Sequence, residues 1–140
     1  MNFTGMLKKG SLQDKVILIT GGGTGLGKSM GKYFMELGAN LIITSRKQDV
    51  LDETAKEFSD YSGEILPIAG DVRNAKEVKP IIETSLDKFG RIDCLVNNAA
   101  GNFISPTERL STKAFDTIVD IVLKGTYNYS LTLGKYWIEN

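Results

Sequence analysis

The sequence contains no histidine and one cysteine among its 140 residues. Without histidine it offers no Ser-His-Asp triad, no Cys-His pair and no histidine ligand for a metal. A single cysteine, Cys94, allows no internal disulfide and no cysteine cluster for zinc, so we expect no metal site. Because Cys94 lies in the apolar run 92–96, we expect a small buried side chain there and not a nucleophile.

A charge excess and a long apolar run are also missing. Lys plus Arg and Asp plus Glu both number 17, so no basic field would attract nucleic acid or an anionic membrane surface. No apolar run is long enough to cross a bilayer, and residues 1–15 lack the apolar stretch of a secretory signal. We therefore expect no nucleic-acid or membrane partner, and a cytoplasmic location with an organellar matrix as the alternative.

The most informative segment that is present is the glycine-rich turn at residues 20–27. It follows an apolar strand at 15–20 and precedes a helical pattern at 26–37. Glycines let the backbone approach phosphates closely, and a helix N-terminus turns free N–H groups toward them. The pattern predicts a diphosphate cradle formed by Gly21, Gly22, Gly23, Thr24, Gly25, Leu26 and Gly27.

Strand and helix patterns alternate along the chain, which predicts an α/β protein with a Rossmann-type doubly wound parallel sheet in the strand order 3-2-1-4. We expect Gly38 to end the first helix in the left-handed conformation, and Asn74 to cap the third. The expected elements are strands 15–20, 40–45, 64–69 and 92–97, and helices 26–37, 48–58, 74–89 and one long helix from about 111.

A complete doubly wound dinucleotide domain has about two strands more than these four. We therefore expect residues 1–140 to be the N-terminal part of a single dinucleotide-binding domain, with C-terminal strands missing from this chain. Residues 1–14 form an N-terminal extension in this interpretation. A compact four-stranded domain is the alternative.

Polar residues follow the expected strands at the edge where a ligand would bind. After the second strand come Ser45, Arg46 and Lys47. An acidic residue at this position would select NAD. The two cations found here instead favour binding of the 2′-phosphate of NADP(H). Asp71 can accept a hydrogen bond from an adenine amino group, and the amide of Asn97 can hold backbone and cofactor together. A solvated basic turn and ordinary turn residues are the alternatives.

Three motifs together resemble the short-chain dehydrogenase/reductase superfamily. The turn 20–27 is similar to its T-G-x-x-x-G-x-G fingerprint, Asp71-Val72 to its adenine-contacting aspartate, and 97–101 to its N-N-A-G element. The resemblance implies that Val72 and Ala99 also contact the cofactor. Segment 97–111, with an extra alanine and an Asn-Phe pair, is similar to the 2,4-dienoyl-CoA reductase branch in particular.

That branch implies NADPH-dependent reduction of 2,4-dienoyl-CoA thioesters to 3-enoyl-CoA in the degradation of unsaturated fatty acids. Asn102 would be catalytic, since a side-chain amide can stabilise charge on the thioester oxygen. The alternative for Asn102 is a plain turn residue. The resemblance implies an acyl-CoA substrate that is contacted by Arg46, Arg73, Phe103 and Ser111. The alternatives are a surface charge for each arginine, core packing for Phe103 and a helix N-cap for Ser111.

Two family features are absent from the sequence. None of its tyrosines has a lysine four residues later, and Val122 stands where many members carry an asparagine before Gly125. We therefore expect these 140 residues alone to be inactive. The alternative functions are another short-chain reductase acting on enoyl or 3-oxoacyl thioesters or alcohols, and a catalytically inactive nucleotide-binding fragment. Apolar residues on several faces of the last helix predict a homo-oligomer, either a dimer or a tetramer.

Overall fold

The computed structural model describes residues 6–140, and a sheet of four parallel strands lies at its centre. The strands are β1 (Val16–Thr20), β2 (Asn40–Ser45), β3 (Ile65–Ala69) and β4 (Cys94–Asn97). Their order is β3-β2-β1-β4, which confirms the predicted doubly wound α/β topology. Of the expected N-terminal extension 1–14, residues 1–5 lie outside the described part.

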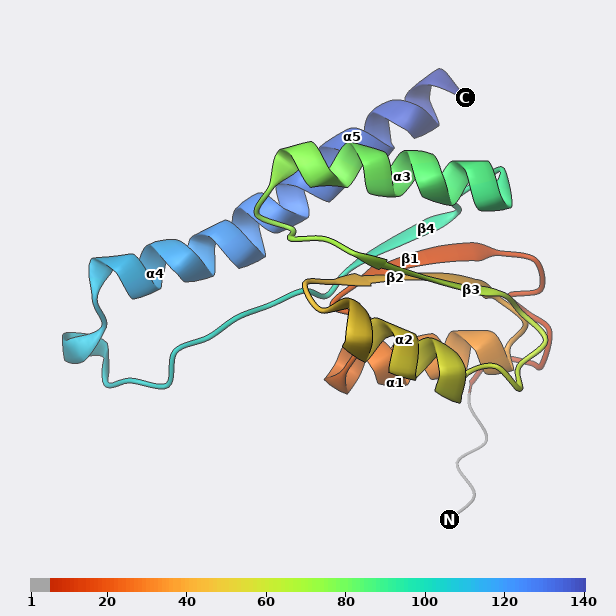
Figure 1. Ribbon diagram of the computed structural model, residues 1–140, viewed down its shortest axis with the longest axis horizontal. Helices are drawn as coiled ribbons and strands as arrows, with labels where there is room; N and C mark the ends of the chain where they lie inside the picture. Colours follow the sequence, from red (N-terminus) through yellow and green to blue (C-terminus); the bar gives the residue numbers. More distant parts are fainter. Residues whose placement is uncertain (1–5) are drawn as a thin grey trace, which may run out of the picture.

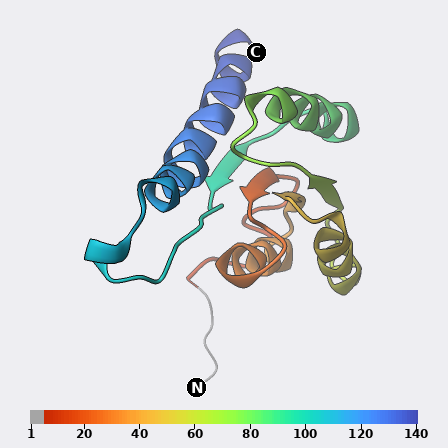
Figure 2. The ribbon, with the colours of Figure 1, turned by 60° about the vertical axis from the view of Figure 1, so that its left-hand side comes forward.

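Helices cover both faces of this sheet (Figures 1 and 2). Helices α1 (Gly25–Glu36) and α2 (Gln48–Glu57) lie on one face, and α3 (Ala75–Phe89) and α5 (Gly125–Glu139) lie on the other. Successive side chains of a strand point to opposite faces, so the apolar run of β1 supplies both halves of the core. Its even-numbered residues pack with α3 and α5, and its odd-numbered residues pack with α1 and α2.

The expected helix ends are present. Gly38 follows α1 with a φ of +97°, a left-handed conformation that glycine adopts without a steric penalty. Asn74 caps α3 by accepting a hydrogen bond from the Lys76 N–H at 3.2 Å. These local signals fix where the chain leaves each helix and enters the next segment of the βαβ pattern.

The periodicity predicts one long C-terminal helix. The structure differs, because this segment is not one regular α-helix. It consists of α4 (Thr112–Val119), a π-helical turn (Asp120–Lys124) and α5. Only α5 lies over the sheet, while α4 projects beyond it (Figure 1). Tyr129 and Leu133 of α5 are therefore fully buried. Phe115 of α4, which belongs to the same expected helix, is 56% exposed.

The expectation of a buried Cys94 is wrong, because its side chain is exposed. Strand β4 lies at the edge of the sheet and pairs with β1 alone, so its residues are covered less than those of β1. The strand is also shorter than expected and begins at Cys94, although Ile92 just before it is buried. The predicted strand order already placed this strand at the edge of the sheet, whereas the expectation for Cys94 rested on the apolar run alone.

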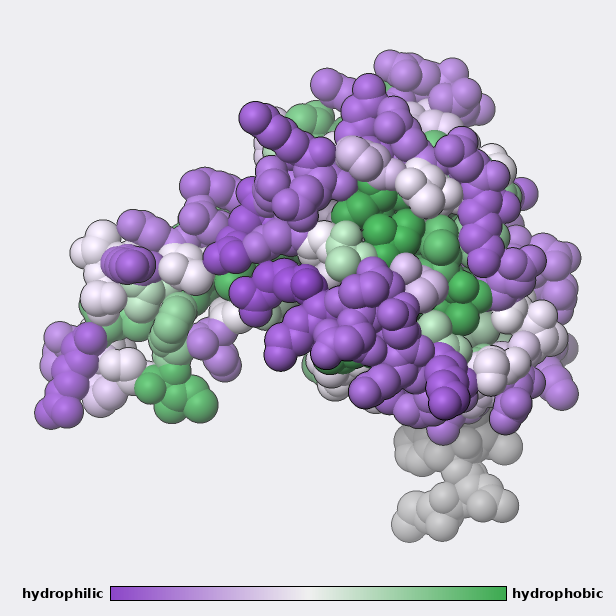
Figure 3. All heavy atoms as spheres, viewed as in Figure 1, coloured by the Kyte–Doolittle hydropathy of each residue, from purple (hydrophilic) through white to green (hydrophobic). Residues whose placement is uncertain are grey.

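Strand β3 forms the opposite edge of the sheet. Figure 3 shows hydrophobic side chains gathered there, between the hydrophilic outer surfaces of α2 and α3. The partly buried residues Ile65, Leu66 and Ile68 belong to this strand. Pro67, which lacks an N–H donor, stands in the middle of β3, and proline is tolerated in a strand at such an edge. Within residues 6–140 no helix combines the length and apolarity needed to pass through a membrane.

Candidate nucleotide-binding cleft

A cleft of about 470 Å³ opens at the carboxyl ends of the strands. The segments that follow all four strands contribute to its lining, as expected for a ligand site in an open parallel sheet. A larger hollow of about 600 Å³ lies between α3 and α5, away from these strand ends. The predicted cofactor-binding residues that line the cleft are Gly21, Thr24, Gly25, Leu26, Ser45, Arg46, Asp71, Val72 and Ala99.

The other predicted glycines support the turn from behind. Gly22, Gly23 and Gly27 do not line the cleft. A Cβ atom at Gly27 would lie 2.3 Å from the Gly21 carbonyl oxygen, so α1 can approach the turn this closely only with glycine there. Gly21 itself has a φ of +68° and donates its N–H to the Thr44 carbonyl at 2.7 Å. The glycines therefore serve close packing as well as phosphate access.

The N-terminus of α1 is suited to bind an anion. Thr24 precedes the helix without capping it through its side chain, and the first turn contains no acidic residue. The free N–H groups of this turn therefore have no side-chain partner, and the positive end of the helix dipole remains uncompensated. Because Thr24, Gly25 and Leu26 line the cleft, a phosphate there would satisfy these donors.

Asn98 holds the glycine turn, a role that the sequence interpretation gave to Asn97. The Asn98 amide donates to the carbonyl oxygens of Thr20 at 3.0 Å and Gly21 at 3.2 Å. Its own N–H and that of Ala99 both donate to the Thr20 hydroxyl, at 3.1 and 3.0 Å. The Asn97 amide donates instead to the Ser130 hydroxyl of α5.

The alternation of side chains along β4 explains why Asn98 and not Asn97 contacts the glycine turn. Leu95 packs in the cluster under α3 and α5, and Val96 packs in the cluster under α1 and α2. Asn97 shares the face of Leu95, which directs it toward α5. Because side chains alternate between the two faces of the sheet, the apolar residues of the strand indicate which face Asn97 shares. This alternation is the sequence signal that distinguishes Asn97 from Asn98.

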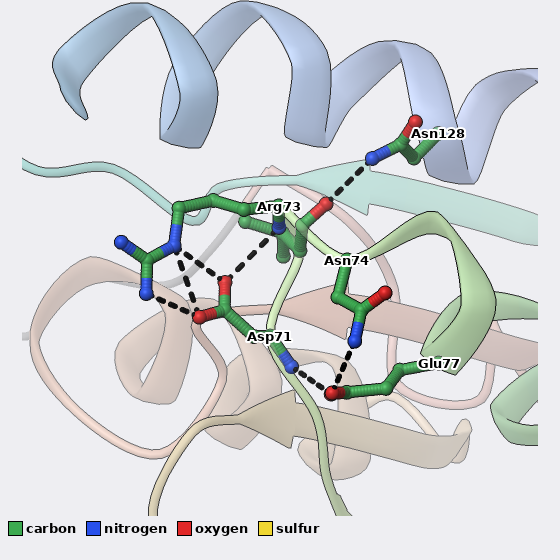
Figure 4. Close-up of polar contacts among 6 residues, drawn as sticks. Asp71, Arg73, Asn74, Glu77 and Asn128 are labelled. Carbon is green, nitrogen blue, oxygen red and sulfur yellow. Dashed lines mark hydrogen bonds and ion pairs between the residues drawn. The ribbon is translucent and has the colours of Figure 1, made fainter. Parts of the chain in front are cut away.

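Asp71 is ion-paired with Arg73 at the rim of the cleft (Figure 4). The Arg73 Nε donates to the two carboxylate oxygens at 2.9 and 3.0 Å, and the Arg73 main-chain N–H donates to one of them at 3.0 Å. The side-chain hydrogen bond from Arg73 lowers the pKa of the Asp71 carboxyl, and the positive charge of Arg46 acts in the same direction. Arg73, predicted to contact acyl-CoA, is thus engaged with the residue predicted to contact adenine.

The main chain around Asp71 is also held, from two helices. Its N–H donates to the Glu77 carboxylate of α3 at 2.8 Å, and Asn74 donates to the other oxygen of the same carboxylate at 2.6 Å. From α5, the Asn128 amide donates to the Val72 carbonyl at 2.9 Å (Figure 4). Neither Glu77 nor Asn128 was identified from the sequence, because no local motif marks their contacts with this turn.

Arg46 differs from Arg73 in having no ion-pair partner within residues 6–140. It is exposed at the end of β2 and lines the cleft beside Ser45. Its guanidinium can therefore bind an anionic group of a ligand in two-pronged geometry without first leaving a carboxylate.

Two of the predicted substrate residues, Phe103 and Ser111, and the predicted catalytic Asn102 lie on the connection between β4 and α4, which runs outward from the sheet (Figure 1). Asn102 is exposed and Phe103 is 50% exposed, so core packing does not explain the phenylalanine. Ser111 caps α4 by accepting the Ala114 N–H at 3.2 Å. The cleft lining includes neither Asn102 nor Phe103, and their roles remain predictions.

The π-helical turn reaches the cleft through Ile121, which belongs to its lining. A Cβ atom at Gly101 would lie 2.8 Å from the Ile121 side chain, so this loop and the helix are in close contact. Helices often widen in this way at functional sites. In the described part of the chain, no group of three or more His, Cys, Asp or Glu side chains is placed to hold a metal ion.

Residues 15–140 match the protein family described as short chain dehydrogenase. A protein of Caenorhabditis elegans named "Probable 2,4-dienoyl-CoA reductase 3 [(3E)-enoyl-CoA-producing]" is 46% identical over 137 residues, which cover 96% of this chain and 44% of that protein. The chain thus spans about half the length of the curated relatives it matches.

Solved structures give the same result. A short chain dehydrogenase from Bacillus anthracis is 46% identical with a TM-score of 0.87, over 92% of this chain and 54% of that one. A 3-ketoacyl-(acyl-carrier-protein) reductase from Brucella melitensis, complexed with NADH, is 35% identical with a TM-score of 0.81, over 88% and 50% of the two chains.

Proposed function

This chain belongs to the short chain dehydrogenase family, and we propose that it is the nucleotide-binding half of an NADPH-dependent 2,4-dienoyl-CoA reductase. The observation that carries the proposal is the cleft, where the uncapped N-terminus of α1, the cation of Arg46 and the carboxylate of Asp71 line one space. These groups fit a diphosphate, a ribose phosphate and an adenine amino group, respectively. The reductase of C. elegans supports the substrate class.

The preference for NADP(H) rests on Arg46. An acidic residue at the end of β2 would bind the ribose 2′-hydroxyl of NAD, and this chain has there an arginine that forms no ion pair with any residue of 6–140. The binding of NADH by the related Brucella enzyme makes NAD(H) the alternative. The discriminating measurement is the ratio of the dissociation constants for NADPH and NADH, titrated against this chain.

We expect Arg46→Glu to weaken NADPH binding by about tenfold to a hundredfold, the effect of one charge-assisted hydrogen-bonded contact, and to maintain or strengthen NADH binding, because an acidic residue there can bind the ribose 2′-hydroxyl. Lys79→Glu is the matched control, because it makes the same charge change at an exposed position on α3. Equal losses for both nucleotides in Arg46→Glu would assign NAD(H) instead, and no binding of either by the parent chain would refute the proposed function.

In the proposed reaction, NADPH would supply the hydride that the δ carbon of the dienoyl thioester gains. The Asn102 amide N–H would stabilise the negative charge that develops on the thioester oxygen, an interaction worth about 3–4 kcal/mol. A proton taken from solvent at the α carbon would complete the 3-enoyl-CoA. Asn102 can act in this way only if the loop that carries it lies against the bound thioester.

The activity belongs to the polypeptide that joins these residues to a Tyr-x-x-x-Lys segment, and we expect this chain alone to be inactive. Loss of NADPH absorbance with a 2,4-dienoyl-CoA measures the reaction. We expect Asn102→Ala in that polypeptide to lower kcat by about a hundredfold to a thousandfold. Turnover of a 3-oxoacyl thioester without turnover of the dienoyl thioester would favour the reaction named for the Brucella relative. Nucleotide binding without turnover of either would favour an inactive module.

We also propose that the full-length enzyme is a homo-oligomer in the cytoplasm or an organellar matrix. Support for self-association comes from exposed apolar side chains on α5 and the turn before it, among them Leu123, Tyr127 and Ile138. A free cysteine that has no disulfide partner fits a reducing compartment. Light scattering tests the assembly, and a monomeric mass would contradict it.

A further inference from the structure

Helix α5 contacts the turn after β3 at two neighbouring points (Figure 4). A Cβ atom at Gly125 would lie 2.7 Å from the Val72 side chain, so the first residue of α5 packs directly against this turn. One helical turn later, the partly buried Asn128 donates to the Val72 carbonyl at 2.9 Å. Val72 is only 7% exposed, so this hydrogen bond is shielded from water.

Asp71 therefore sits between two main-chain groups that are both tied to helices. Its own N–H is bound by Glu77 of α3, and the carbonyl of the next residue is bound by Asn128 of α5. These contacts restrain the peptide group before Asp71 and the Val72–Arg73 peptide group, whose N–H donates to the Asp71 carboxylate at 3.0 Å. Asp71 lines the cleft and Asn128 does not, so any effect of Asn128 on a ligand passes through the turn.

We propose that Asn128 is a positioning residue for nucleotide-base selection. By holding the Val72 carbonyl, it keeps the Asp71 carboxylate where it accepts a hydrogen bond from the amino group of adenine. This inference rests on the proposed function, because it assumes that the cleft binds an adenine dinucleotide. An amide suits the position because its N–H donates to the carbonyl, whereas a carboxylate there would repel it.

The test measures base selection rather than affinity alone. Hypoxanthine carries a carbonyl where adenine carries its amino group, so at that position the hypoxanthine analogue of NADPH presents an acceptor, and not a donor, to the Asp71 carboxylate. We expect the parent chain to bind NADPH at least about tenfold more tightly than this analogue. Asn128→Ala should reduce the preference to within about threefold, while the NADPH-to-NADH ratio, which depends on Arg46 at another strand end, stays unchanged.

Trp137→Phe is the matched control. Trp137 also lies on α5 and donates from its side chain to a main-chain carbonyl, that of Ile92 at 2.7 Å, but Ile92 precedes β4 and lies away from the cleft. Its loss should leave base selection unchanged. If Asn128→Ala does not fold, Asn128→Gln retains the amide at a shifted position, and we expect an intermediate preference.

The outcomes separate this inference from the proposed function. Failure of the parent chain to bind NADPH refutes both. Two outcomes overturn the role of Asn128 alone. In the first, the parent chain binds NADPH but does not distinguish the two bases. In the second, a folded Asn128→Ala or Asn128→Gln variant retains the full preference. A reduced preference in Trp137→Phe would also overturn it, because any loosening of α5 would then be sufficient.

Discussion

The side-chain amide of Asn98 donates to the main-chain carbonyl of Thr20 at 3.0 Å and so ties the segment after β4 to the end of β1. The same amide reaches the Gly21 carbonyl, and Asn98 is partly buried. One side chain thus holds the glycine turn in place against the neighbouring strand.

Asn98→Ala should lower the free energy of unfolding by about 1–3 kcal/mol, because two carbonyl groups lose their donor. Urea unfolding followed by circular dichroism measures the loss. Asn97→Ala is the control, since its exposed amide bonds only the exposed Ser130 hydroxyl, and we expect a loss below about 1 kcal/mol. Equal losses in the two variants would contradict the assignment of the turn to Asn98.

Two glycine-to-alanine substitutions should have opposite effects. Gly27→Ala places a methyl group 2.3 Å from the Gly21 carbonyl oxygen and 2.6 Å from the Asn98 amide nitrogen, so the turn must move. We expect a loss of about 1–3 kcal/mol in stability together with loss of nucleotide binding. Gly134→Ala, in open space within α5, should raise stability by about 0.5–1 kcal/mol. Thermal unfolding and NADPH titration of both variants check this pair.

The ion pair of Asp71 and Arg73 should give a pH-dependent contribution to stability. Arg73 lowers the pKa of Asp71 in the folded state, so the contribution is complete above the unfolded-state pKa of about 3.9 and disappears as pH falls through the lower folded-state value. Arg73→Gln should therefore be less stable than the parent near neutral pH, by less than about 1 kcal/mol because the pair is partly exposed. The two unfolding free energies should converge below about pH 4. A difference that is constant from neutral to acidic pH would contradict the electrostatic cause.

Tyr129→Phe should leave the free energy of unfolding unchanged or raise it by up to about 1 kcal/mol. Within residues 6–140 the buried hydroxyls of Tyr129 and Thr44 have no hydrogen-bond partner of good geometry, although the two face each other, and burial raises the pKa of the tyrosine. Removing the Tyr129 hydroxyl therefore takes away a desolvation cost and at most a weak contact with Thr44. Tyr129→Leu should cost about 2–4 kcal/mol through the cavity it leaves. A comparable loss in the phenylalanine variant would show that the hydroxyl is bonded in solution.

The topology could be predicted because it follows from local patterns. Apolar strands alternating with amphipathic helices permit few arrangements once right-handed crossovers are required, and the order β3-β2-β1-β4 is one of them. The cleft at the strand ends follows from that order, and with it the positions of Gly21, Arg46 and Asp71. The caps at Gly38 and Asn74 are local as well, since each depends on residues within one turn.

The remaining features depend on contacts that a linear pattern does not encode. Cys94 is exposed because β4 has a neighbour on one side only, and an apolar run has the same appearance at an edge as at the centre. Asn128 reaches a carbonyl 56 residues away, and no spacing rule connects the two. Arg73 lies two residues after Asp71, a spacing that permits an ion pair between them as readily as separate contacts with a ligand.

The π-helical turn at Asp120–Lys124 rotates α4 about the helix axis relative to α5. An extra residue in one helical turn swings everything before it by about 100° relative to an unbroken α-helix. Deleting a single residue there would keep α5 anchored on the sheet through Tyr129 and Leu133 while redirecting α4 and the loop that carries Asn102. Chain length at this one position therefore sets both the direction of the segment that carries Asn102 and the part of the cleft wall that Ile121 forms.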